Sequence, residues 1–148
     1  MRGRVKILKF QKKFLPQMVR LYCDVYSSSS KKVTKEMGNW TLSYCLKISP
    51  DFCLMATDAD SQCLGAVFSR RDLSYVGQTY YVESIQIEKK FRNLGIAQAL
   101  MTALVKKCKE KKIGKLYLDF DNGNKELKYL YSKLGFKDTG WVVYDMSF

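Results

Sequence analysis

The chain has 148 residues, a formal net charge of +12 at pH 7 and no histidine. This length suits one domain, and a content of 47% hydrophobic and 14% aromatic residues excludes a disordered chain. Without histidine, Ser-His-Asp and Cys-His catalysis are excluded and the commonest metal ligand is missing. We therefore expect a single domain over residues 1–148, without a metal, whose general base is a carboxylate, tyrosine, lysine or water.

Cysteine spacing and hydropathy indicate the compartment. The five cysteines are odd in number and contain no C-x-x-C pair, so we expect buried free thiols in a reducing environment. No apolar run approaches the roughly 20 residues that a membrane span needs, and the basic start leads into no signal-peptide core. The sequence therefore favours a soluble, cytoplasmic protein with no membrane contact.

The N-terminal half predicts a strand, two helices and a hairpin. Residues 5–10 alternate as an edge strand does, Pro16 can open a helix, and Thr34 is an N-cap for a second helix to about residue 47. Helical spacing places Met37, Trp40 and Tyr44 on one side of that second helix. Residues 52–57 and 63–69 predict an antiparallel hairpin around a polar turn.

The C-terminal half predicts a strand–helix–strand unit. Residues 79–88 form a long strand whose alternation places Tyr81, Glu83, Ile85 and Ile87 on one face. An amphipathic helix over residues 95–112 then leads to a further strand, a short helix ending at Gly135, and one or two strands over residues 136–148. A right-handed crossover makes the central pair parallel, so the class is α/β: a mixed sheet of α+β type with flanking helices.

The turn between the long strand and its helix carries an anion-binding pattern. It reads Arg92-x-x-Gly95-x-Ala97 and follows Lys89 and Lys90. Free backbone N–H groups at a helix N-terminus, together with the helix dipole, favour phosphate and pyrophosphate. Taken alone, the pattern also fits an ordinary basic loop.

Two motifs together resemble the GNAT superfamily of N-acetyltransferases. One is the strand at residues 82–87 followed by Arg92-x-x-Gly95-x-Ala97; the other is Asn124-x-x-Leu-x-x-Leu-Tyr131-x-x-Leu-Gly135-Phe136. Their order and separation also match, so the resemblance covers nearly the whole chain. It is distantly similar to the small diamine acetyltransferase type, but Ser84 replaces an acidic residue of that pattern. The last hairpin of the family is trimmed here.

The resemblance implies transfer of an acetyl group from acetyl-CoA, as co-substrate, to a primary amine of a small molecule or peptide. The amine attacks directly in a ternary complex. The implied cofactor-binding residues are Ile85, Ile87, Arg92, Asn93, Leu94, Gly95, Ile96, Ala97, Asn124 and Tyr131. Asn124 is also a natural helix N-cap, and the two readings are compatible.

Two side chains are candidates for catalysis. The resemblance and the carboxylate itself make Glu83 the candidate base, directly or through water, although a solvent-facing or lysine-paired carboxylate is the plainer reading. Tyr131 would protonate the departing thiolate, and its plainer reading is a core tyrosine beside Leu127 and Leu134. Candidate acceptor-binding residues are Tyr26, Trp40, Tyr81 and Glu83, with Tyr75 and Tyr80 as further aromatics near the cleft.

Two other functions compete with catalysis. The fold could hold acyl-CoA as a non-catalytic sensor, which Ser84 and the short C-terminus leave open. A basic nucleic-acid-binding domain is disfavoured, because the positive charge is scattered and no nucleic-acid motif is present. The resemblance alone also suggests a homodimer.

Overall fold

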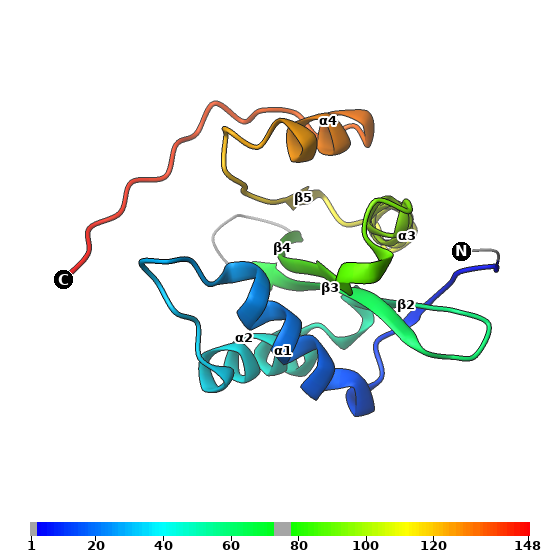
Figure 1. The fold of residues 1–148 in the computed structure, drawn as a ribbon. Helices are drawn as coiled ribbons and strands as arrows, with labels where there is room; N and C mark the ends of the chain where they lie inside the picture. The colour runs from blue at the N-terminus through cyan, green and yellow to red at the C-terminus, as the bar shows by residue number, and fades with distance from the viewer. Residues whose placement is uncertain (1–2, 73–77) are drawn as a thin grey trace.

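The computed structural model describes residues 3–72 and 78–148 and contains a five-stranded sheet of order β1-β2-β3-β4-β5 (Figure 1). The strands are β1 (Lys6–Lys9), β2 (Cys53–Thr57), β3 (Cys63–Asp72), β4 (Thr79–Ile87) and β5 (Lys115–Tyr117). Neighbours pair antiparallel except β4 and β5, which are parallel. This confirms the predicted mixed sheet.

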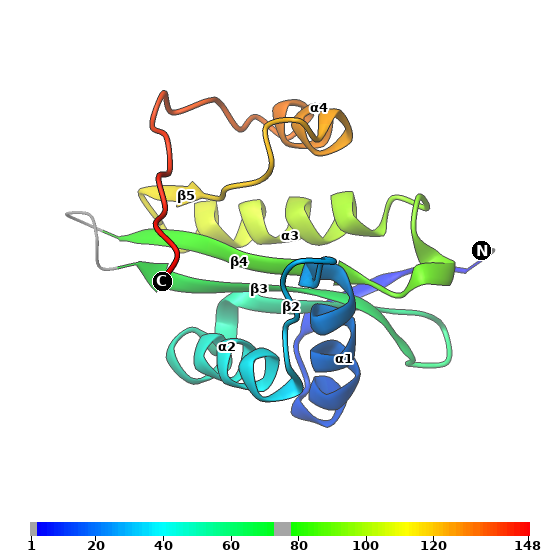
Figure 2. The same cartoon turned by 60° about the vertical axis from the view of Figure 1, so that its left-hand side comes forward.

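Helices cover both faces of the sheet (Figure 2). They are α1 (Leu15–Tyr26), α2 (Lys35–Ile48), α3 (Ile96–Glu110) and α4 (Lys125–Lys133), and three short 3-10 turns are η1 (Lys12–Phe14), η2 (Pro50–Phe52) and η3 (Lys89–Phe91). Helices α1 and α2 lie on one face and α3 on the other. Each face has its own apolar cluster, around Leu100 and Leu104 on the α3 side and around Met18 and Leu42 on the other. The sheet is therefore buried on both sides at its centre.

Because of a bulge in β4, the side chains of that strand point to other faces of the sheet than predicted. Phe68 pairs with Ser84 and the next β3 residue, Ser69, pairs with Val82, so Glu83 is an additional residue on β4. An extra residue reverses the alternation beyond it. Val82, Ile85 and Ile87 consequently pack in the α3-side core, whereas Glu83 faces α2. The prediction that Glu83 shares a face with Ile85 and Ile87 was wrong.

β4 and β5 separate soon after they pair. The parallel pairing covers Thr79, Tyr80 and Tyr81 only, while β4 continues to Ile87. Figure 2 shows β5 leaving toward α4 while β4 runs on beneath α3. Within the described residues, no strand pairs with the β5-facing edge of β4 beyond Tyr81, so the sheet opens into a gap there.

Helix α2 begins at its predicted N-cap and leaves one of its two apolar sides exposed. Thr34 is its N-cap, as predicted, and its hydroxyl accepts from the Met37 N–H at 3.2 Å. The side on which the helical spacing places Met37, Trp40 and Tyr44 is the exposed side. The buried face is instead Gly38, Leu42, Cys45 and Leu46, which have the same helical spacing. A stripe of large apolar side chains is therefore left on the outside of α2.

The chain after α4 also differs from prediction. Residues 137–148 form no strand in the structure and run away from the body as an extended segment (Figure 1). Its large apolar residues are strongly exposed, the least of them being Val142 at 70%. The residues alternate in a strand-like way, but a strand needs a hydrogen-bonding neighbour, and none of the described strands pairs with this segment.

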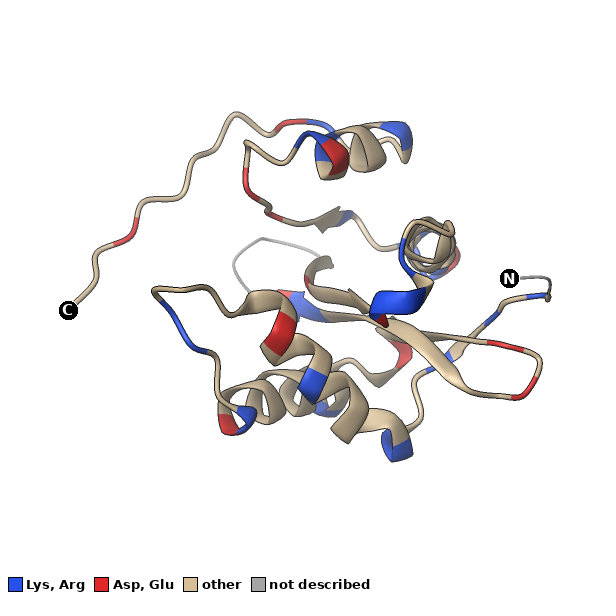
Figure 3. Cartoon of the chain, in the orientation of Figure 1, with Lys and Arg blue, Asp and Glu red and all other residues tan. Residues whose placement is uncertain are grey.

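All five cysteines lie within the described residues and are free thiols, four of them buried. This confirms the prediction of buried free cysteines. Across residues 3–72 and 78–148, no helix is both long and apolar enough to cross a bilayer. Lysine and arginine are spread over several elements, including the turn between β4 and α3 (Figure 3).

Candidate functional site

The turn from β4 into α3 presents free backbone donors. Gly95 is the N-cap of α3 and has a left-handed backbone, with φ +80°. Since glycine has no side chain to cap the helix, the first N–H groups of α3 stay available. A Cβ at Gly95 would meet nothing within 4 Å, so the position needs glycine for its backbone angle. With exposed Lys89, Lys90 and Arg92 beside it, this turn suits an anion.

Backbone groups of β4 face the gap between β4 and β5. The N–H of Glu88 donates to the Leu64 carbonyl on the β3 side. Because backbone groups alternate sides along a strand, those of Ile85 and Ile87 point away from β3 and into the gap. They are the polar groups that a bound chain in the gap would meet.

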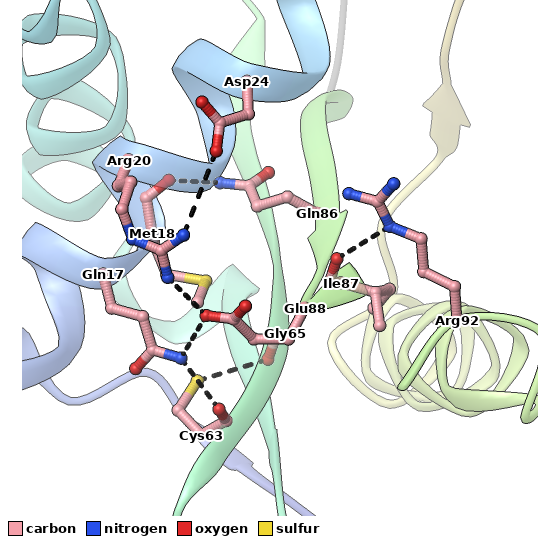
Figure 4. Close-up of polar contacts among 10 residues, drawn as sticks. All are labelled: Gln17, Met18, Arg20, Asp24, Cys63, Gly65, Gln86, Ile87, Glu88 and Arg92. Carbon is pink, nitrogen blue, oxygen red and sulfur yellow. Dashed lines mark hydrogen bonds and ion pairs between the residues drawn. The ribbon is translucent and has the colours of Figure 1, made fainter. Parts of the chain in front are cut away.

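Side chains of the protein itself bind two of these backbone groups, the Ile87 carbonyl and the Ile85 N–H. The Arg92 Nε donates to the Ile87 carbonyl at 3.0 Å (Figure 4). The Tyr26 hydroxyl accepts from the Ile85 N–H, and burial raises the pKa of Tyr26 to about 12 despite that donor, with Tyr131 and Tyr22 adding to the rise. Tyr26 as a whole residue is 40% exposed, although burial of its hydroxyl is the main cause of the raised pKa.

Tyr131 lies at the inner side of α4. It is 6% exposed and packs against Phe120 and Phe136, with ring centroids 5.3 and 5.7 Å away. Burial raises the pKa of Tyr131 above its ordinary value, so it is protonated at neutral pH. Its electrostatic effect on Tyr26 indicates that the two hydroxyls lie in one region. A neutral phenol is thus placed near the gap.

Glu83 lies on the α2 side of the sheet, in a pocket under that helix. Its Oε2 accepts from Arg70 Nε at 3.0 Å, and both side chains are about one quarter exposed. The pocket has a volume of about 400 Å³ and is lined by Trp40, Thr41, Tyr44, Arg70 and Glu83. The bulge therefore directs a carboxylate toward an aromatic wall.

Glu88 joins α1 to the anion-binding turn. Its Oε1 accepts from Arg20 at 2.7 Å and from Gln17 at 3.0 Å, and Gln17 also donates to the Cys63 carbonyl (Figure 4). Hydrogen bonds to a charged acceptor are among the stronger ones. They fix the residue that directly follows β4, where the turn begins.

A sequence profile described as the acetyltransferase (GNAT) family matches residues 15–136. The chain belongs to the GNAT family. This member of the GNAT family is 25% identical over 113 residues to N-alpha-acetyltransferase 30 of Dictyostelium discoideum, and the match covers 76% of the chain. It spans only 60% of the length of that relative.

Solved structures share the fold of this GNAT family member. Aminoglycoside N-acetyltransferase AAC(6')-Iy in complex with CoA has a TM-score of 0.78 at 17% identity, covering 99% of this chain and 97% of that one. Ribosomal-protein-alanine N-acetyltransferase of Brucella melitensis biovar Abortus 2308 has a TM-score of 0.70 at 20% identity, covering 98% and 99%. These two proteins are named for different acceptors, and each is only distantly similar in sequence to this chain. The likeness therefore establishes the fold alone.

The structure of this GNAT family member places the predicted residues at the pocket under α2, along β4 and in the turn before α3. Trp40 and Glu83 line one pocket, and Tyr26 contacts Ile85. The Tyr81 hydroxyl donates to Asp119 at 3.0 Å beside that pocket. The remaining predicted residues of the turn follow in sequence: Arg92, Asn93, Leu94, Gly95, Ile96 and Ala97, of which Ile96 is buried.

Other predicted residues of this GNAT family member lie elsewhere or have a structural role. Tyr80 packs on Phe52 at 4.2 Å in the α3-side core, so it does not line the cleft. Asn124 is the N-cap of α4, and its Oδ1 accepts from the Leu127 N–H at 3.1 Å. Tyr75 lies outside the described residues.

The sequence-based prediction did not include Tyr44, Arg70 and Glu88 of this GNAT family member. Tyr44 could have been found by its helical spacing from Trp40. The pairing of Arg70 with Glu83 depends on the bulge, for which the sequence carries no clear signal.

Proposed function

We propose that this GNAT enzyme transfers an acetyl group from acetyl-CoA to a primary amine, which attacks directly in a ternary complex. The observation that carries the proposal is the gap beside β4, where the Ile85 N–H and the Ile87 carbonyl face outward and lead to the N-terminus of α3. An extended ligand with amide groups can pair with such an edge, and its pyrophosphate can bind the helix terminus. The CoA complex of a protein with this fold supports the assignment.

In this proposal, backbone N–H groups of residues 92–97 hold the pyrophosphate and the side chains of Lys89, Lys90 and Arg92 add charge. The Ile87 carbonyl accepts from a pantetheine amide, and the Ile85 N–H is left for the thioester carbonyl, so Arg92 and the Tyr26 hydroxyl must first leave these two groups. Asn124 keeps its Oδ1 in the helix cap, and its amide nitrogen is free to donate to the cofactor arm.

The chemistry requires a base, a carbonyl donor and an acid. Glu83 accepts the proton of the acceptor amine, directly or through water, and the amine nitrogen bonds to the acyl carbon. The Ile85 N–H donates to the carbonyl oxygen as it becomes negative. The carbon–sulfur bond then breaks, and the Tyr131 hydroxyl protonates the thiolate of CoA. The raised pKa of Tyr131 keeps that hydroxyl protonated throughout the neutral range.

A thermal-shift titration with acetyl-CoA, CoA and ATP tests the binding half of the proposal. A ligand at 100 times its Kd adds roughly 2.7 kcal/mol of stability. For a chain of this size that is a Tm rise of roughly 5–11 °C. We expect this rise with both CoA species and not with ATP. No rise with either CoA species would remove the basis of the proposal.

Substitutions test the catalytic half. Glu83→Gln and Tyr131→Phe should each lower kcat by about 10²-fold, because general acid–base catalysis contributes roughly 10²–10⁴-fold. The Kd for acetyl-CoA should remain nearly unchanged in both variants, since neither side chain is proposed to hold the pyrophosphate. Unchanged kcat in both variants would refute the assigned roles.

A non-catalytic acyl-CoA sensor is the second candidate. It is favoured by the Arg70–Glu83 ion pair, which keeps the proposed base engaged. A sensor would show the same thermal shift with acetyl-CoA and no thiol release with any amine. The first function requires thiol release that depends on the acceptor.

A homodimer belongs to the same proposal. The exposed apolar segment from Trp141 to Phe148 has no cover within the described chain, and large exposed apolar surfaces in soluble proteins are commonly contact sites. Light scattering coupled to size-exclusion chromatography should give twice the mass of 17.2 kDa. A mass of one chain at micromolar concentration would exclude the dimer.

A further inference from the structure

An aromatic wall stands on the exposed side of α2. Trp40 and Tyr44 lie one helical turn apart with their rings parallel, at an interplanar angle of 3° and a centroid distance of 5.8 Å. Their side chains are 70% and 43% exposed, although the opposite side of α2 is fully packed. Large aromatic side chains left outside the core beside a pocket are typical of ligand contacts, since they offer a flat, rigid surface.

The floor of this pocket carries one positive and one negative charge. Arg70 and Glu83 are 3.0 Å apart, so their charges largely cancel. The nearby carboxylates are already engaged, because Tyr81 donates to Asp119 and Tyr117 donates to Asp72. A volume of about 400 Å³ lies at the lower end of small-molecule sites. The pocket thus suits one compact ligand with a single polar end.

These charges disfavour an acceptor with many amines. A polycation gains from a cluster of unpaired carboxylates, and the described residues that line the pocket offer one carboxylate, which is paired with Arg70. The chain as a whole has a net charge of +12. A ligand with one ammonium group needs only one oxygen of Glu83. The second oxygen stays on Arg70, so the ion pair orients the carboxylate instead of competing with the ligand.

We propose that the acceptor is a small primary amine with one positive charge and an aromatic body. Its ring stacks on Trp40 and Tyr44, and its amine lies at Glu83. This inference rests on the proposed acetyl transfer and specifies its substrate class. Trp40 and Tyr44 then determine specificity and take no part in the bond changes, which remain those described for the amine, the acyl carbon and the thiolate.

An amine panel tests the substrate class by thiol release in the presence of acetyl-CoA. The probes are 2-phenylethylamine, tryptamine, n-butylamine, spermidine, and two peptides that begin with Phe and with Ser. Two stacking partners support a preference of about tenfold in kcat/KM for the two aromatic amines over butylamine and spermidine. Higher kcat/KM for spermidine, for butylamine or for either peptide would overturn the inference.

Variants of the wall add a test within one substrate. Trp40→Ala should lower kcat/KM for 2-phenylethylamine about tenfold, chiefly through KM, and lower the value for butylamine much less. Trp40→Phe should restore most of the loss. Tyr129→Ala is the matched control, because Tyr129 is 72% exposed on α4 and lies outside the pocket. An equal effect of Trp40→Ala on both amines would overturn the stacking role.

The outcomes also separate this inference from the function on which it rests. A thermal shift with acetyl-CoA and transfer to non-aromatic amines would refute the substrate class and keep the acetyltransferase. Absence of any shift, or a shift without thiol release from any probe, would refute both.

Discussion

Gly65 offers a direct test of the close contact between β3 and β4. It pairs with Ile87, and a Cβ placed there would lie 2.6 Å from Ile87 Cδ1 and 2.7 Å from the Gln86 carbonyl oxygen. One of these contacts is with backbone, so a Gly65→Ala variant must push β4 away. Figure 4 shows Gly65 beside the strand end that carries Ile87, Glu88 and the contact with Arg92.

The expected magnitude follows from two opposing effects. Overpacking a close contact costs roughly 1–3 kcal/mol, and replacing glycine restricts the unfolded chain and returns about 0.4–1 kcal/mol. The net loss is therefore on the order of 1–2 kcal/mol, or roughly 2–8 °C in Tm. Because the shift moves Ile87, the affinity for acetyl-CoA should fall as well.

Thermal unfolding and acetyl-CoA titration measure both effects. Gly114→Ala is the matched control, since a Cβ there would only touch the Gln78 carbonyl oxygen at 3.4 Å. The control should leave Tm unchanged or slightly raised. A Gly65→Ala variant as stable as the control would refute the reasoning about the strand contact, and a destabilised variant with unchanged acetyl-CoA affinity would refute its link to the site.

Three further predictions concern stability and thiol chemistry. Thr34→Ala should cost about 0.5–2 kcal/mol by removing the helix cap while Thr34→Ser keeps most of it, and equal Tm values for the two would exclude capping as the cause. Burial raises the pKa of Cys53 to about 12 and that of Cys63 to about 11, from 9.0. The unfolded chain therefore loses these protons first, and the free energy of unfolding should fall between pH 9 and about 12. Urea titrations at stepped pH would measure this fall, and a constant free energy of unfolding over that range would contradict it. Cys23 is the one cysteine that is not buried, so a thiol reagent should modify about one site per native chain and five after unfolding, as mass spectrometry would count.

The sequence allowed most elements of the fold to be predicted, because their patterns are local. The helix after Gly95, the capped start at Thr34 and the strand order around the parallel pair depend on nearby residues and on general connection rules. The anion-binding turn was predictable for the same reason, since its left-handed glycine and its following helix are contiguous.

The errors arose where a non-local contact decides the outcome. The bulge at Glu83 depends on register with β3 and reverses the side on which every later side chain lies. Helix α2 has apolar residues at helical spacing on both sides, so periodicity could not choose between Met37–Trp40–Tyr44 and Leu42–Cys45–Leu46. The final segment alternates like a strand, but alternation alone does not supply a pairing partner.

The unpaired edge of β4 also bears on how the protein behaves in a test tube. An exposed strand edge is a template for adding another chain, and proteins usually cover such edges or place charges on them. Here Arg92 and Tyr26 each cover a single backbone group. We therefore expect preparations without ligand to self-associate on storage, and acetyl-CoA to suppress the increase in turbidity by filling the same edge. Cofactor supply would then govern the solubility of the protein as well as its turnover.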